Sequence, residues 1–87
     1  MGAYTAGMKP SIGRIVLIPA TAVGAPNNGG DVAPAIITRV WAHNMVNVRV
    51  LLDGNDTPWK TSVTLYESAD AMVESGNTYG CYWPPRV

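Results

Sequence analysis

The chain has 87 residues, only 14% of them charged, and its six basic side chains are balanced by six acidic ones. Average soluble proteins are about 25% charged, so we expect many neutral side chains at the surface or at a subunit interface. The balance argues against nucleic acid as a partner, because nucleic-acid-binding proteins usually carry a basic excess. One small domain with a limited core and few charges predicts a homo-oligomer. The alternative is a compact monomer with a neutral surface.

The chain has few features that indicate a cellular compartment. The single cysteine, Cys81, excludes an intramolecular disulfide. No apolar run approaches the roughly 18 residues that a membrane span needs. Residues 1–10 show no basic segment followed by an apolar one, the pattern of a signal peptide. We therefore expect a cytoplasmic protein with no membrane partner.

The N-terminal third predicts one strand and two irregular segments. Residues 1–9 are small and polar and predict a flexible segment before a single domain at residues 10–87. A first strand is expected at residues 14–18, ended by Pro19. Both faces of this strand are apolar, which predicts a strand that is central or covered on both sides. Residues 20–33 are rich in Gly, Pro and Asn and predict a long loop, which in so small a domain is often functional.

A hairpin is predicted in the middle of the chain. Residues 35–42 are β-branched and apolar, and residues 45–53 alternate with a period of two. His43 and Asn44 lie between them, and Asn tolerates the left-handed conformation of a tight turn. One face of the second strand carries Val46, Val48, Val50 and Leu52. The opposite face carries Asn47, Arg49, Leu51 and Asp53. The first set is predicted to be buried, and a bulge near residues 36–40 would exchange the faces of the preceding strand.

The last third predicts two strands with a helix between them. A fourth strand is expected at residues 59–66. A short helix is expected within residues 67–77, where Ser68 is a candidate N-cap and Gly76 a candidate stop. A last strand, rich in aromatic residues, follows at residues 78–83. Five short strands with a helical turn before the fifth predict an all-β fold, a five-stranded SH3-like small barrel.

Five segments of the chain carry a resemblance to known proteins. They are GRIVLI at residues 13–18, AIITRVW at 35–41, VNVRVLLDG at 46–54, TSVTLY at 61–66 and YWPP at 82–85. Together they resemble a group of short phage and prophage proteins that are SH3-like. The resemblance implies a virion accessory, an inhibitor of a host enzyme, or a protein that sequesters nucleotide signals of host immunity. It supplies no site motif that maps onto single residues.

The residue types that catalysis needs are scarce. His43 lies in the predicted turn and is expected to be exposed, and Cys81 is expected to be a small buried hydrophobe. A Cys–His nucleophilic pair would need the end of the second strand to meet the fifth. One His and one Cys cannot complete a four-ligand zinc site. We predict no enzyme activity, no metal and no cofactor.

Aromatic residues are the strongest binding signal. Every ring carries a polar group, because the chain has Tyr and Trp but no Phe, and such rings suit interfaces and base-stacking sites. The predicted ligand-binding residues are Arg39, Trp41, Trp59, Tyr66, Trp83 and Arg86. Arg39 and Trp41 share one strand face, and arginine pairs with phosphate or stacks on a base. The alternative is that the rings fill the core and a subunit seam.

These observations predict a non-catalytic, phage-encoded binding protein in the cytoplasm of the infected bacterial host. Its ligand is expected to be a small nucleotide, an immune signal that the protein sequesters in a pocket between identical subunits. The alternatives are a structural or accessory virion protein and a protein inhibitor that docks on a host enzyme.

Overall fold

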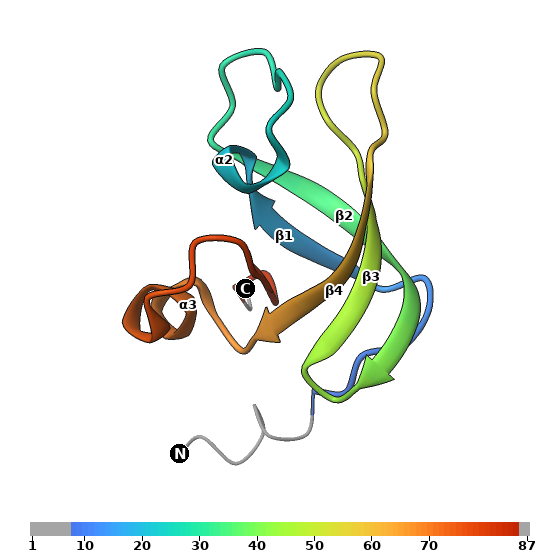
Figure 1. Ribbon diagram of the computed structural model, residues 1–87, viewed down its shortest axis with the longest axis vertical. Helices are drawn as coiled ribbons and strands as arrows, with labels where there is room; N and C mark the ends of the chain where they lie inside the picture. Colours follow the sequence, from blue (N-terminus) through green and yellow to red (C-terminus); the bar gives the residue numbers. More distant parts are fainter. Residues whose placement is uncertain (1–7, 86–87) are drawn as a thin grey trace.

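A computed structural model of the chain describes residues 8–85, and these residues form a closed five-stranded β-barrel (Figure 1). The strands are β1 (Ile15–Pro19), β2 (Val32–Ala42), β3 (Met45–Val50), β4 (Trp59–Tyr66) and β5 (Cys81–Tyr82). Two short helices, α2 (Ala20–Val23) and α3 (Ala69–Ser75), interrupt them. The predicted all-β architecture, a small five-stranded barrel with a short helix before the last strand, is confirmed. Of the predicted flexible segment, only Met8 and Lys9 lie within the described residues.

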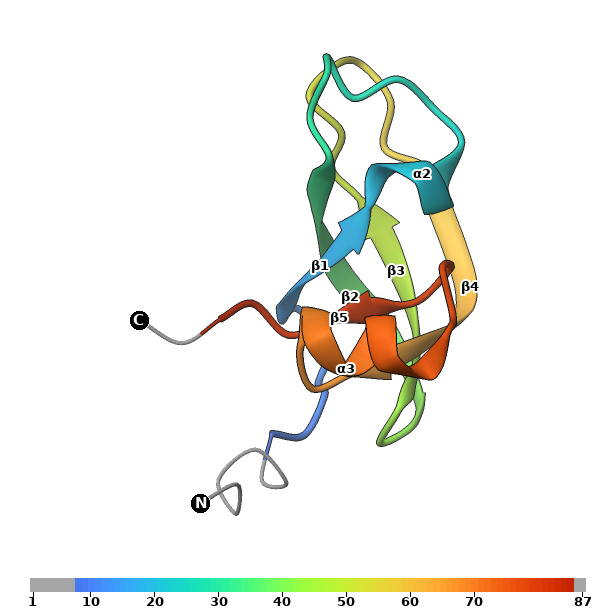
Figure 2. The same cartoon turned by 90° about the vertical axis from the view of Figure 1, so that its left-hand side faces the viewer.

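The strands follow one another around the barrel in chain order. Each neighbouring pair from β1 to β4 is antiparallel, β4 and β5 are parallel, and β5 closes the barrel against β1. Both helices lie on the side of the barrel that faces the viewer in Figure 2. Among residues 8–85, the outer face of β2 and β3 therefore has no helix over it.

The barrel interior is filled by small, branched side chains that alternate along the strands. The fully buried ones include Val16, Ile18, Ile37, Val46, Val48 and Val50. The predicted register of β3 is confirmed, because Val46, Val48 and Val50 all point inward and none is exposed. Burying each such side chain contributes about 1.5–3 kcal/mol.

The predicted first strand is correct in position but not in environment. Val16 and Ile18 are buried, whereas Ile15 on the opposite face is exposed. Of the two predicted alternatives, a central strand is confirmed, because β1 pairs with both β2 and β5, and cover on both faces is wrong at Ile15. Ile15 pairs with Ile36 of β2, and their side chains lie on the outer face of the barrel.

The predicted loop at residues 20–33 is shorter than expected. Its first four residues form α2, which ends at Gly24 with a left-handed φ of 75°. Its last two residues belong to β2. Ala22 and Val23 of α2 are buried against the core, so packing outweighs the turn-forming composition of the segment.

The predicted helix within residues 67–77 is confirmed as α3. The Ser68 side chain accepts a hydrogen bond from the Ala71 backbone N–H at 3.1 Å, as an N-cap does. Gly76 ends the helix with a left-handed φ of 80°. Within residues 8–85, no helix is long and apolar enough to cross a membrane.

Candidate ligand-binding site

Strand β3 places a set of polar and aromatic side chains on the outer face of the barrel. Because Val46, Val48 and Val50 point inward, Asn47 and Arg49 point outward. Asn47 is paired across the sheet with Arg39 of β2, and Arg49 with Trp59 of β4. Trp41 reaches the same face, since its ring N–H bonds to the Asn47 side chain. The Trp41–Trp59 face is defined here by Arg39, Trp41, Asn47, Arg49, Trp59 and Thr61.

Asn47 is the centre of the Trp41–Trp59 face. Only 5% of its surface is exposed. Its side-chain oxygen, Oδ1, accepts hydrogen bonds from Trp41 Nε1 at 2.8 Å, Thr61 Oγ1 at 3.0 Å and the Ser62 backbone N–H at 2.8 Å. These three contacts fix the orientation of the amide. Its outward direction was predicted from the alternation, but its burial beneath Trp41 was not.

Irregular pairing on both sides of Asn47 creates this arrangement. Thr61 and Ser62 together stand opposite Asn47, which is a β-bulge, and Ser62 has a left-handed φ of 56°. On the other side, the pairing of β2 with β3 shifts twice, with Thr38 and Trp41 as the extra residues, and the shift at Thr38 lies where a bulge was predicted. The bulge turns the Ser62 N–H toward Asn47 Oδ1, which satisfies a donor that the ladder leaves free.

The amide nitrogen of Asn47, Nδ2, is an unused donor on this face. It has no hydrogen-bond partner among residues 8–85. No side-chain nitrogen or oxygen in that range is both sealed from solvent and unpartnered, so Nδ2 keeps a small contact with solvent although Asn47 is buried. Because Oδ1 is held by three donors, the orientation of the amide is fixed before any ligand arrives. A fixed donor of this kind binds an acceptor without a large loss of side-chain entropy.

Two half-exposed indoles flank this donor, each with an arginine beside it. Trp41 is 51% exposed and Trp59 is 52% exposed. The Arg39 guanidinium lies 4.2 Å from the Trp41 ring centre, a cation–π contact, and it confirms the predicted shared face. Arg49, opposite Trp59, donates from Nη1 to the Thr57 carbonyl oxygen at 3.2 Å. This is the one side-chain bond of Arg49 within the described part of the chain, and it leaves most of the five guanidinium donors without a partner there.

The charge of these strands has one sign. The charged residues of β2, β3 and β4 are Arg39, Arg49 and Lys60, and none is acidic. The acidic residues lie outside the strands, at Asp31, Asp53, Asp56, Glu67, Asp70 and Glu74. Although the net charge of the chain is zero, strands β2, β3 and β4 carry only positive charges. This favours an anionic ligand at this face.

The structure separates the ring residues that were predicted to form one site. Arg39, Trp41 and Trp59 share the Trp41–Trp59 face, whereas Tyr66 and Trp83 lie at one end of the barrel. Arg86 lies outside the described residues. Asn47 and Thr61 were missed, although an Asn between buried valines in a strand is unusual enough to be a signal.

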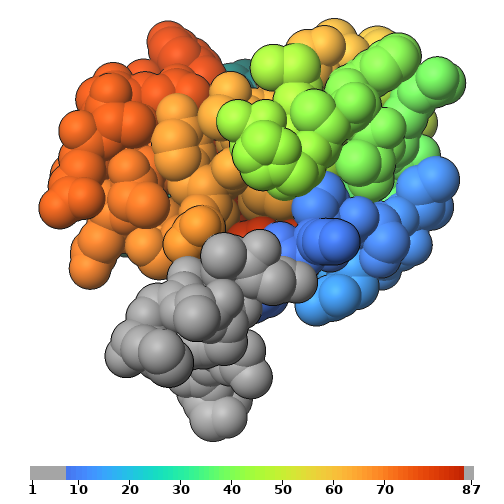
Figure 3. All heavy atoms as spheres, turned by 90° about the horizontal axis from the view of Figure 1, so that it is seen from below, coloured from blue at the N-terminus to red at the C-terminus, as the bar shows by residue number. Residues whose placement is uncertain are grey.

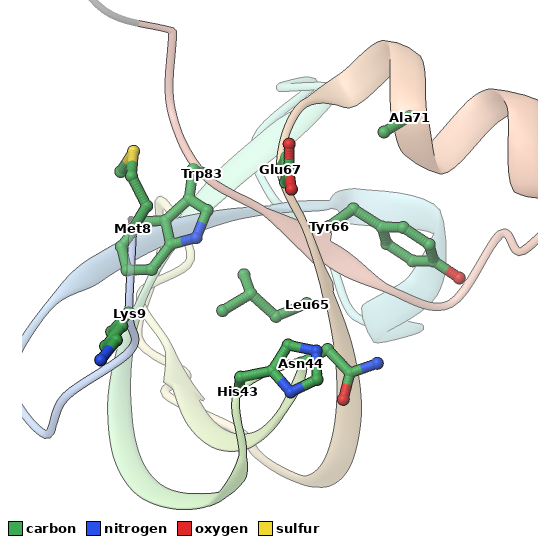
Figure 4. Close-up of a pocket in the computed structure, with 9 residues that line it drawn as sticks. All are labelled: Met8, Lys9, His43, Asn44, Leu65, Tyr66, Glu67, Ala71 and Trp83. Carbon is green, nitrogen blue, oxygen red and sulfur yellow. The ribbon is translucent and has the colours of Figure 1, made fainter. Parts of the chain in front are cut away.

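At the barrel end, Tyr66 and Trp83 line a pocket of about 370 Å³ (Figure 4). Figure 4 shows the Tyr66 ring directed away from Trp83, on the other side of Leu65, so the two rings do not form one cluster. Trp83 is buried in the core, and the Arg14 guanidinium lies 5.0 Å from its ring centre. Trp83 therefore acts as a core residue. Figure 3 views the molecule from this end, where the first described residues lie against the β2–β3 hairpin.

The two candidate nucleophile positions are as predicted. His43 is exposed in the β2–β3 turn, and Cys81 is buried in β5. In the described part of the chain, no three His, Cys, Asp or Glu side chains come close enough together to hold a metal ion.

We expect the Cys81 thiol to resist alkylation in the folded protein. Burial raises its pKa from 9.0 to about 12, although a backbone hydrogen bond opposes the shift. Because the folded state favours the neutral thiol, its contribution to stability is complete below pH 9 and is lost as the pH rises from 9 to about 12. Mass spectrometry after iodoacetamide treatment at pH 8 should show labelling only in denaturant. Rapid labelling of the native protein would contradict the burial of this thiol.

Comparisons of the chain with protein-family models, with curated proteins and with solved structures gave no match. The resemblance to phage and prophage proteins therefore stays a prediction.

Proposed function

We propose that the protein is a non-catalytic, phage-type binding protein that sequesters a nucleotide immune signal on the Trp41–Trp59 face. The observation that carries this proposal is the presence of two half-exposed indoles, each with an arginine beside it, on the face that the fixed Asn47 amide organises. A nucleotide is both planar and anionic, and this face offers a complement to each property.

Each part of a nucleotide has a counterpart on the face. A base stacks on the exposed surface of Trp41 or Trp59, a contact that tolerates any base. Phosphate oxygens accept hydrogen bonds from the guanidinium groups of Arg39 and Arg49, and arginine suits phosphate because its planar donors match phosphate geometry. Asn47 Nδ2 supplies a neutral donor between them. Sequestration needs binding alone, and these side chains supply binding groups.

Removing either half of the Arg39–Trp41 pair should weaken nucleotide binding. Losing one base–aromatic stack costs roughly 1–3 kcal/mol, so Trp41→Ala should raise Kd about 5- to 150-fold. Arg39→Ala should also weaken binding, and added salt should weaken binding of the wild type because the contact is ionic. Calorimetry against cyclic di- and trinucleotides and cyclic ADP-ribose isomers measures these effects.

The matched control is Tyr79→Ala, because Tyr79 is 70% exposed but lies between α3 and β5, off the Trp41–Trp59 face. Its affinity should equal that of the wild type. Trp83→Ala is unsuitable, because removing a buried ring leaves a cavity. If no nucleotide binds below about 10 μM, corresponding to roughly −7 kcal/mol, the sequestration proposal fails.

Contact with another protein is the second candidate function. Trp and Arg are the residue types that dominate binding energy at protein interfaces, and both are exposed on this face. A virion protein or a docking inhibitor would use the same surface. Co-purification from infected cells separates these candidates from sequestration, because a protein partner would be lost from the Trp59→Ala variant and retained by Tyr79→Ala.

We also propose that the protein is a homo-oligomer, with a second copy completing the ligand pocket. Exposed apolar side chains on the outer side of β1 and β2, including Ile15 and Val32, offer area for such a contact. Light scattering at micromolar concentration should then give at least twice the 9.2 kDa chain mass. A mass of 9.2 kDa at every concentration would remove the interface pocket and leave the open face of a single chain.

A further inference from the structure

We infer that the Trp41–Trp59 face binds a dinucleotide, two bases joined through phosphate, rather than a single nucleotide. This inference rests on the proposed function, and it names the ligand class more narrowly. It is carried by the duplication of the ring-and-arginine arrangement on the two sides of β3, with the Asn47 donor between them.

The two rings occupy separate positions on the sheet. Trp41 belongs to β2 and bonds to Asn47, whereas Trp59 belongs to β4 and stands opposite Arg49. Strands β2 and β4 flank β3, so their backbones lie roughly 10 Å apart, and Asn47 and Arg49 are separated by about 6.6 Å along β3. A purine is about as large as an indole, so one base covers one of the two rings and leaves the other bare. Two bases are needed to cover both.

The groups between the rings suit the link between two bases. Asn47 Nδ2 has no hydrogen-bond partner among residues 8–85 and lies on β3 between the two rings, and Arg49 retains guanidinium donors beyond its bond to the Thr57 carbonyl. A phosphodiester that crosses β3 meets both. Arg39, stacked on Trp41, offers a second cation on the β2 side. The absence of acidic residues from β2, β3 and β4 removes repulsion along this path.

Because the ring-and-arginine pair is duplicated, the affinity of the face should be higher for a dinucleotide than for a mononucleotide. A dinucleotide engages both rings in one event, so the second stack adds to the first without a second loss of translational freedom. A mononucleotide engages one ring at a time. The dinucleotide should therefore bind about 5- to 150-fold more tightly than the mononucleotide, the factor expected for one additional stack.

The test is calorimetry of the full chain with three probes that share one base: adenosine monophosphate, linear adenylyl-adenosine and cyclic diadenylate. A ten-nucleotide oligoadenylate is the fourth probe. The variants are Trp41→Leu, Trp59→Leu and the double variant, with Tyr79→Leu as the matched exposed-ring control. We expect each single variant to reduce dinucleotide affinity to the mononucleotide level. Mononucleotide affinity should fall by no more than about twofold, because the second ring still binds it.

Three results would overturn the inference or its basis. If the mononucleotide and the dinucleotides bind with equal affinity and Trp59→Leu has no effect, the dinucleotide inference is refuted. Nucleotide binding at Trp41 then still stands. Affinity that rises with every added nucleotide up to ten refutes it in favour of single-stranded nucleic acid. Failure of all four probes to bind the wild type refutes the proposed function itself.

Discussion

Replacing Val50 with Asp is expected to abolish the folded state. Val50 is completely buried in β3, and its backbone N–H bonds to the Pro58 carbonyl oxygen at 2.8 Å, so the strand cannot turn this side chain outward without breaking its register. An unpaired carboxylate in the core costs several kcal/mol. That cost is a large part of the roughly 5–15 kcal/mol that stabilises a typical domain. Circular dichroism of Val50→Asp should show no cooperative thermal transition.

The same substitution at an exposed valine provides the control. Val73 in α3 is 74% exposed, so Val73→Asp should lower stability only by the small difference in helix propensity, less than about 1 kcal/mol. If Val50→Asp kept its transition within a few degrees of the wild type, Val50 would face solvent. The register of β3, and with it the outward direction of Asn47 and Arg49, would then be wrong by one residue.

Replacing Asn47 with Leu is expected to produce the second-largest loss of stability. Leu fills a similar volume but accepts no hydrogen bond, so Trp41 Nε1 and the Ser62 N–H lose their partner. The three bonds to Oδ1 are part-buried, and a typical hydrogen bond contributes about 0.5–1.5 kcal/mol, so the free energy of unfolding should fall by roughly 1.5–4.5 kcal/mol. Urea denaturation followed by tryptophan fluorescence measures this change.

The Asn47→Asp variant separates the two roles of this side chain. A carboxylate still accepts the three hydrogen bonds that Oδ1 accepts, and it stands across the sheet from Arg39. It lacks the Nδ2 donor. We therefore expect Asn47→Asp to unfold much closer to the wild type than Asn47→Leu. If Asn47→Leu were within about 0.5 kcal/mol of the wild type, the bulge would be held by something other than these bonds.

Much of the barrel could be predicted from local patterns. The strict alternation of residues 45–50 determines which β3 side chains face the core, because a strand has a period of two. Ser68 and Gly76 bracket α3 because each supplies the backbone partner or conformation that a helix end requires. These signals depend on near neighbours in the chain, which is why the sequence alone reveals them.

The features that the sequence did not reveal depend on contacts between distant segments. Helix α2 forms in a segment of loop-like composition because Ala22 and Val23 pack against the core. The bulge at Ser62 is a property of the pairing between β3 and β4, and no glycine marks its left-handed residue. Neither feature has a local sequence pattern of its own.

The candidate site likewise contains some residues that the sequence predicted and others that only the structure revealed. Arg39, Trp41 and Trp59 were predicted as ligand residues from their chemistry, and they share one face. Tyr66 and Trp83 have similar chemistry but lie at the barrel end, since a ring by its residue type alone does not indicate whether it faces the core or the surface. Asn47, whose amide organises the face, is marked in the sequence as an Asn between valines, but its three donors lie on the neighbouring strands and appear only in the structure.

The central claim is that the Asn47 amide helps to bind an anionic nucleotide. Calorimetry of the wild type and of Asn47→Asp at pH 7 tests this claim most directly. The wild type should bind at least one nucleotide of the panel with Kd below about 10 μM. Asn47→Asp, folded by circular dichroism, should bind it roughly 10- to 150-fold more weakly, because it loses a hydrogen bond to a charged group and places a carboxylate beside the phosphate. Equal affinity in the two proteins, or no binding by the wild type, would contradict the claim.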